Sequence, residues 1–195
     1  MKEKQLKHPR KVVWAMRDFL NEISELTYEV ETYPSIKNET EEEWFNRFLE
    51  GGTIEKRKAT CKLIETCRSF SANMNSIGCE HFVIGYNIDS LFSAGVKQFR
   101  QDITSRSTIT KGFADITLAL LHELGHLSCD NDFGDYDRFK AMNELEKYPL
   151  NEINFHYFKL PDETAATNWA IEWLQNSEHR KTAKRFEKKF FACFE

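Results

Sequence analysis

The stretch LALLHELGHLSC, residues 118–129, carries the motif H-E-x-x-H inside an apolar run with the character of a buried helix. Positions i and i+4 of an α-helix lie one turn apart on the same face, so His122 and His126 can direct two imidazoles at one ion. Zinc binds imidazole nitrogen at about 2.0–2.1 Å. Glu123 follows the first histidine, where it can act as a general base on a water at the ion. The motif predicts a catalytic zinc site; the simpler alternative is a packed helix with two incidental histidines.

A catalytic zinc site usually has three protein ligands and keeps one position for water, so a third ligand must lie elsewhere. Glu163 stands in the first turn of a predicted helix, where small neighbours permit close packing and the helix N-terminus stabilises a carboxylate. Asp132 lies six residues after His126, at the place of the last ligand in the longer H-E-x-x-H-x-x-G-x-x-H motif. His156 is a ligand, a donor to the reacting carbonyl, or an ordinary core-edge histidine. The pattern favours Glu163 and leaves the other two open.

Composition limits the remaining function classes. The chain has 195 residues, which favours one domain with a helical extension, and its net charge of −4 gives no electrostatic case for binding nucleic acid. The five cysteines are odd in number and form no C-x-x-C pair, so neither a disulfide framework nor a zinc ribbon is indicated. No secretory signal and no membrane-spanning apolar stretch is present in the sequence given. We therefore expect a cytoplasmic protein with reduced thiols.

Hydrophobic periodicity divides the chain into a helical first third and a mixed remainder. We predict helices over residues 11–30, 40–49 and 53–74, a strand at 81–86, and weaker edge strands at 96–99 and 103–109. After the motif helix, we expect a loop-rich segment at 130–160, a helix beginning at Pro161, and a final stretch at 178–194 that interleaves phenylalanines with lysines and arginines.

H-E-L-G-H at 122–126, taken with E-x-x-A at 163–166, resembles the gluzincin metallopeptidases, and most strongly the ImmA/IrrE-type metallopeptidases. The likeness covers roughly residues 80–175. The chain departs from that pattern at Thr167, where the family usually has Asn or Asp, and at Asp130, where it often has His. The second helix matches the family pattern at Glu163, Ala166, Trp169-Ala170 and Leu174.

The resemblance implies a zinc ion held by His122, His126 and Glu163, with Glu123 as the catalytic base. It also implies an α+β, zincin-like fold, in which a small mixed sheet accompanies the HExxH active-site helix and a second Glu-bearing helix, after a helical N-terminal extension. We expect a helical N-terminal region at residues 1–75 and a metallopeptidase domain at 76–195, or one compact domain. The implied function is a zinc metalloendopeptidase that cleaves a protein substrate, such as a regulator or repressor.

A peptidase also needs residues that bind the substrate and residues that stabilise the transition state. A strand within 103–109 would hold an extended peptide by strand addition. His156, Tyr157 and Tyr136 are the candidate donors to the developing oxyanion.

Two other functions compete with a peptidase. One is a non-catalytic interaction protein on a zincin scaffold, although the intact Glu123 favours an enzyme. The other is a nucleic-acid-associated anti-defence protein, whose footprint would be the basic C-terminal stretch. The simpler explanation of that stretch is an amphipathic helix that buries its phenylalanines and solvates its lysines.

Overall fold

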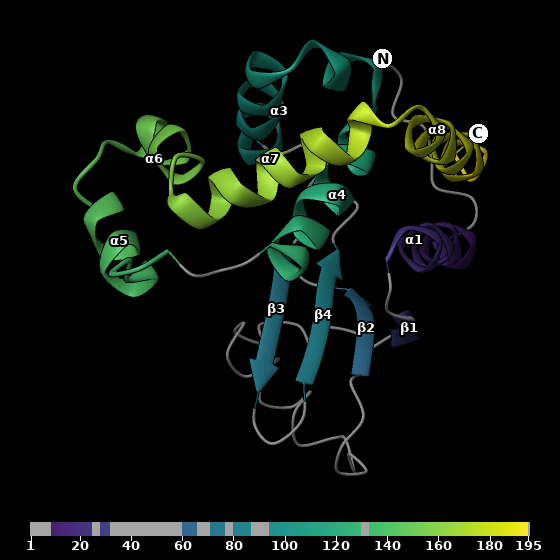
Figure 1. The fold of residues 1–195 in the computed structure, drawn as a ribbon, viewed down its shortest axis with the longest axis horizontal. Helices are drawn as coiled ribbons and strands as arrows, with labels where there is room; N and C mark the ends of the chain where they lie inside the picture. The colour runs from purple at the N-terminus through teal and green to yellow at the C-terminus, as the bar shows by residue number, and fades with distance from the viewer. Residues whose placement is uncertain are drawn as a thin grey trace.

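The computed structural model describes residues 9–24, 28–31, 60–65, 71–76, 80–86, 94–129 and 133–194 (Figure 1). The first half contains α1 (Pro9–Ile23), β1 (Tyr28–Glu31), β2 (Thr60–Glu65), β3 (Ser71–Ser76) and β4 (Glu80–Tyr86). The second half contains α3 (Ala94–Arg106), the 3₁₀ helix η2 (Thr108–Gly112), α4 (Asp115–Ser128), α5 (Arg138–Leu145), α6 (Leu150–Tyr157), α7 (Pro161–Gln175) and α8 (Ser177–Phe191).

The four strands form one sheet in the order β1-β2-β4-β3. β1 and β2 run parallel, as do β2 and β4, and the register places Leu63 between Val30 and Ile84. β3 runs antiparallel to β4 and ends the sheet on that side. α4 packs against β3 and β4, and α1 packs against β1 (Figure 1). The sheet thus lies beside the motif helix, with β3 as its nearest edge.

The helical body is organised around α4, which crosses α7 and contacts α3 and α8. Its apolar side chains, Leu118, Leu120 and Leu121, are fully buried. Burying each such side chain contributes about 1.5–3 kcal/mol to the free energy of folding. α1 and α8 pack together through stacked rings of Phe19 and Phe186, whose centroids are 4.4 Å apart.

The start of α4 receives its cap from the C-terminal helix. Ala114, at the N-cap, has no polar side chain that could accept a hydrogen bond. Its backbone N–H donates to Glu187 Oε1 at 2.5 Å. Thr117 Oγ1 donates to the same oxygen at 3.0 Å, and Lys184 Nζ lies 2.6 Å from Glu187 Oε2. A carboxylate at a helix N-terminus is favoured by the helix dipole. α8 therefore anchors the helix that carries the motif.

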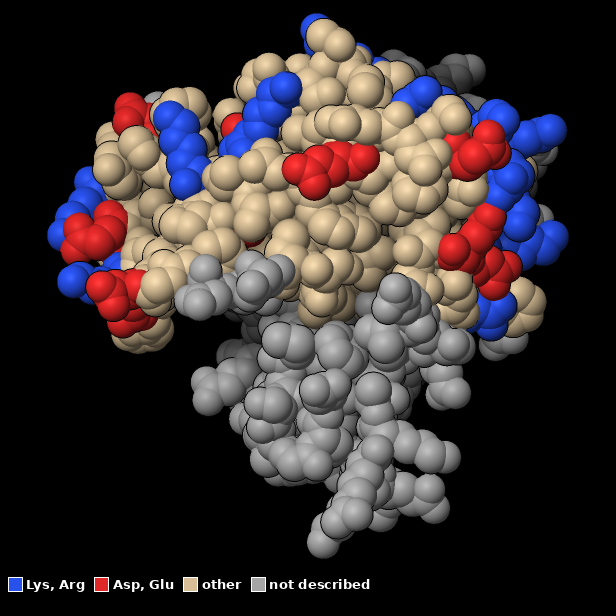
Figure 2. Space-filling model, viewed as in Figure 1, with Lys and Arg blue, Asp and Glu red and all other residues tan. Residues whose placement is uncertain are grey.

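α8 is amphipathic, as the simpler explanation of the basic stretch predicts. Phe186 and Phe190 are buried, whereas the lysines and arginines remain at the surface. Figure 2 shows blue side chains along the right-hand edge of the view, where α8 lies, with acidic side chains among them. Among the described residues, no helix has both the length and the apolar composition that crossing a bilayer requires.

The predicted fold class is wrong. Helices hold 79% of the residues whose side chains are described, so the molecule is predominantly helical and not α+β. The strands of its sheet come from residues 28–86, and none comes from residues 96–109, where we predicted them. Residues 96–99 and 103–109, predicted as strands, lie largely in α3 and η2. The strands that the structure describes fall at 28–86, and β2 and β3 occupy much of the segment 53–74 that we predicted to be a helix.

Local composition explains these errors. β-branched residues in 96–109 suggested strands, but Phe99 and Ile103 are spaced four apart and both face the core of a helical pair. The loop-rich prediction for 130–160 is also wrong, since α5 and α6 lie there. The structure confirms the helix at the motif, the helix from Pro161 and the strand at 81–86. The helix predicted over 11–30 is confirmed only as far as Ile23, because β1 begins at Tyr28. The helix predicted at 40–49 lies outside the described residues.

Candidate metal centre

Two helices bring three donor side chains to one point. α4 supplies His122 and His126, one turn apart, and the first turn of α7 supplies Glu163. His122 Nε2 lies 3.0 Å from Glu163 Oε2 and 3.2 Å from His126 Nε2. His126 Nε2 lies 3.5 Å from the same carboxylate oxygen. The three atoms form a nearly equilateral triangle.

The size of this triangle fits a tetrahedral zinc ion. Ligand atoms at about 2.0–2.1 Å from a tetrahedral centre lie about 3.3–3.4 Å from one another. The three observed separations, 3.0, 3.2 and 3.5 Å, lie on either side of that value. Each imidazole Nε2 carries at most one proton, so hydrogen bonds alone cannot satisfy all three contacts at once. A cation at the centre would accept a lone pair from all three atoms at once.

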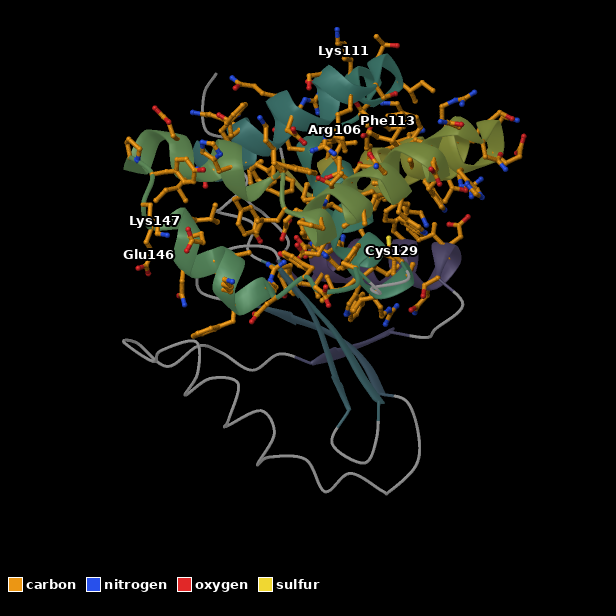
Figure 3. The ribbon with its side chains drawn as sticks, turned by 60° about the vertical axis from the view of Figure 1, so that its left-hand side comes forward. Arg106, Lys111, Phe113, Cys129, Glu146 and Lys147 are labelled. Carbon is orange, nitrogen blue, oxygen red and sulfur yellow. The ribbon has the colours of Figure 1, made fainter. Side chains whose placement is uncertain are left out.

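Close packing of the two helices makes this convergence possible. A Cβ atom built on Gly125 would lie 2.6 Å from the backbone oxygen of Ala166, far inside van der Waals contact. Only glycine lets α4 approach α7 this closely. Pro161 begins α7 at the position where its missing N–H is tolerated, and Glu163 follows within the same first turn. Arg106, labelled in Figure 3, donates from α3 to the carbonyl oxygen of Phe158 at 2.8 Å and holds the chain that leads into α7.

The site is buried, so its charges require partners. Glu163 is 1% exposed and His122 is 5% exposed. Burial by itself raises the pKa of Glu163, but hydrogen bonds and charges from His122 and His126 outweigh it and hold that pKa well below its usual range. Burial lowers the pKa of His126, yet its contact with Glu163 raises it above the usual value. Glu163 is therefore an anion poised among groups that stabilise its charge.

A second contact fixes the orientation of His122. Thr167 Oγ1, fully buried on α7, lies 3.2 Å from His122 Nδ1. With an ion at the centre, His122 would carry its proton on Nδ1 and donate it to Thr167, and its Nε2 would present a lone pair to the ion.

Glu123 lies beside the triangle on α4 and is buried. Burial raises the pKa of its carboxyl, against the opposing charges of His122 and His126. A base is most effective when its pKa lies near the working pH, so this direction suits proton transfer. Glu123 is adjacent to the donor set without contributing an atom to it.

Residues from α5, α6 and the segment before them surround the outer side of Glu163. Arg138 Nη2 donates to Glu163 Oε1 at 3.0 Å and to the hydroxyl of Tyr157 at 3.2 Å. Arg138 also forms an ion pair with Asp162, which accepts a hydrogen bond from the hydroxyl of Tyr136 at 2.8 Å. Burial raises the pKa of Tyr157, so this phenol stays protonated.

The other residues that we predicted for the site make different contacts around the three donor side chains. The hydroxyl of Tyr157 accepts a hydrogen bond from Arg138, which also donates to Glu163. The hydroxyl of Tyr136 donates to Asp162, the residue before Glu163. His156 stacks on Tyr148, with ring centroids 3.6 Å apart, and is not among the three clustered donors. Asp132 lies outside the described residues.

Arg138 was not among the site residues that we predicted from the sequence. No local pattern marks this residue, because its neighbours in sequence have no part in the motif. Arg138 precedes Glu163 by 25 positions in the sequence, and the two meet because the segment between α4 and α7 folds back over the start of α7. The one available signal is indirect: a buried carboxylate that binds a metal usually needs a second polar partner, and that segment contains cationic side chains.

No protein-family model matches this chain, and neither a curated protein nor a solved structure shows significant similarity to it.

Proposed function

We propose that this protein is a zinc-dependent metallopeptidase that cleaves a protein or peptide substrate. The observation that carries the proposal is the triangle of His122 Nε2, His126 Nε2 and Glu163 Oε2, with separations of 3.0–3.5 Å that suit a tetrahedral ion. Two neutral imidazoles and one carboxylate leave a bound Zn²⁺ with a net positive charge, which favours an electrophilic centre over a purely structural one.

A zinc ion held there would lower the pKa of a coordinated water to about 7 and would polarise the scissile carbonyl. Glu123 accepts the proton of the attacking water at its carboxylate and then donates it to the departing amine. Its raised pKa favours the first of these steps, because a more basic carboxylate takes up a proton more readily. Tyr157 stays protonated and shares the guanidinium of Arg138 with Glu163, so it is the donor that we favour for the developing oxyanion.

The edge strand β3 offers a place for an extended substrate. We expected that role for residues 103–109, but these residues are helical or follow a helix, so the role passes to β3. β3 ends the sheet and packs against α4. A peptide that adds to this edge would have one end near α4, which carries His122 and Glu123.

The proposal is tested by comparing wild type with Glu123→Gln, which keeps size and hydrogen bonding but cannot take a proton at neutral pH. We expect equal zinc content in both and about a 10²–10⁴-fold lower cleavage rate in the variant. Zinc is measured by elemental analysis, and substrates are found by mapping new N-termini in cellular extracts incubated with each protein.

Glu163→Ala should lose most of its zinc, whereas His156→Ala, a matched loss of a potential ligand outside the cluster, should keep it. Zinc binding without any new N-termini would instead support a non-catalytic interaction protein. Equal zinc content in wild type and Glu163→Ala would overturn the metal site itself.

A further inference from the structure

The two oxygens of Glu163 face different partners. Oε2 points to the two histidines, at 3.0 and 3.5 Å, and Oε1 accepts from Arg138 at 3.0 Å. We infer that Arg138 is a positioning residue that makes Glu163 bind the ion through one oxygen only. This inference rests on the proposed metal site and concerns how that site keeps a coordination position for water.

Arg138 is held in place by three acceptors. Its guanidinium donates to Glu163 Oε1 and to Tyr157 OH, and it pairs with Asp162. Asp162 is itself fixed by the hydroxyl of Tyr136. A planar guanidinium with several fixed acceptors has a defined orientation, which a flexible ammonium group lacks. The position of Oε1 is therefore set by residues that come from outside the donor set.

The consequence for an ion follows from simple coordination chemistry. A carboxylate with both oxygens available can bind zinc through both and occupy two positions. With Oε1 engaged by Arg138, Glu163 supplies one ligand atom, and the two histidines supply two more. One tetrahedral position then remains for water or substrate, which is the arrangement a catalytic site requires.

The alternative is that Arg138 only compensates the charge of a buried carboxylate. The side chain of Arg138 is 45% exposed, so part of its charge already interacts with solvent. If charge alone mattered, a lysine at this position would serve equally well. If orientation matters, lysine would fail, because its ammonium is a point charge without the planar fork.

Cobalt(II) substitution tests this, because four-coordinate cobalt absorbs visible light much more strongly than five- or six-coordinate cobalt. We saturate four full-length proteins with cobalt: wild type, Arg138→Met, Arg138→Lys and Lys140→Met. Lys140→Met is the control, because it removes a cation from the same helix. Circular dichroism checks their folding. We expect a several-fold weaker absorption band in Arg138→Met and Arg138→Lys, and a wild-type band in Lys140→Met.

Each outcome has a clear meaning. A wild-type spectrum in saturated Arg138→Met would overturn the inference and leave the metal site standing. A wild-type spectrum in Arg138→Lys alone would overturn the orienting role in favour of charge compensation. Should Arg138→Met fail to fold, Arg138→Lys carries the test. If wild type binds neither cobalt nor zinc, the proposed function falls, and the inference falls with it.

Discussion

Two residues outside the donor set contact its members: Thr167 lies 3.2 Å from His122 Nδ1, and Arg138 donates to Glu163 Oε1 at 3.0 Å. His122 and His126 could be predicted because their relation is a property of helix period alone. Glu163 required a guess that two helices meet, and the structure places its carboxylate 3.0 Å from His122 Nε2. Arg138 and the contact of Thr167 with His122 depend on how α7 and the segment before it pack, which no local pattern encodes.

Thr167→Val removes the hydroxyl that contacts His122 Nδ1 and keeps a side chain of similar shape. We expect zinc affinity to fall about 10- to 100-fold, because the ring loses the partner that fixes its tautomer and orientation. A competition titration with a chromophoric chelator measures the change. The control is Thr164→Val on the same helix, since Thr164 bonds to the carbonyl of Phe158 and not to a histidine. Equal affinities in the two variants would contradict this role for Thr167.

At the scale of elements, the crossing of α4 and α7 determines the site. Gly125 sits where a Cβ atom would lie 2.6 Å from the Ala166 backbone oxygen, and backbone cannot move aside as a flexible side chain can. The motif helix was predictable from its apolar run. The angle and depth of its crossing with α7 were not, because they arise from a contact between residues far apart in sequence.

Gly125→Ala should therefore destabilise the protein, although alanine is normally the better helix former by about 1 kcal/mol. Overpacking of a tight helix contact typically costs about 1–3 kcal/mol in the free energy of unfolding, which exceeds that gain. Urea denaturation followed by circular dichroism measures the difference. Gly112→Ala is the matched control, because a Cβ atom there meets nothing within 4 Å. A Gly125→Ala variant as stable as Gly112→Ala would show that the helices separate without penalty.

At the scale of the whole molecule, distant parts of the chain converge on α4. The sheet packs against it through β3 and β4, and α8 caps its N-terminus through Glu187 across 73 positions. This explains why the predicted fold class failed. A sequence pattern reports on one segment at a time. The strands before residue 87 and the helices after it depend on packing between segments that lie far apart in the sequence.

Glu187→Ala removes the acceptor of the Ala114 N–H and of the Thr117 hydroxyl, both at the start of α4. We expect the free energy of unfolding to fall by about 1–3 kcal/mol, since buried donors are left without a partner. Chemical denaturation measures the loss. Glu178→Ala, which removes an exposed acidic side chain from the same helix, should change stability by less than about 0.5 kcal/mol. Equal losses in the two variants would mean that Glu187 does not cap α4.

Metal removal tests the coupling between the site and the fold as a whole. His122 and Glu163 are 41 positions apart, so the donor set exists only in the folded chain, and an ion that binds it stabilises the folded state. At a free zinc concentration of 100 times Kd, the expected stabilisation is about 2.7 kcal/mol. Thermal unfolding of wild type should therefore shift to lower temperature when a chelator is added and return when zinc is restored. His126→Ala should show a much smaller shift, because only two donors remain. A chelator response of the same size in both proteins would place the stabilising ion somewhere other than this triangle.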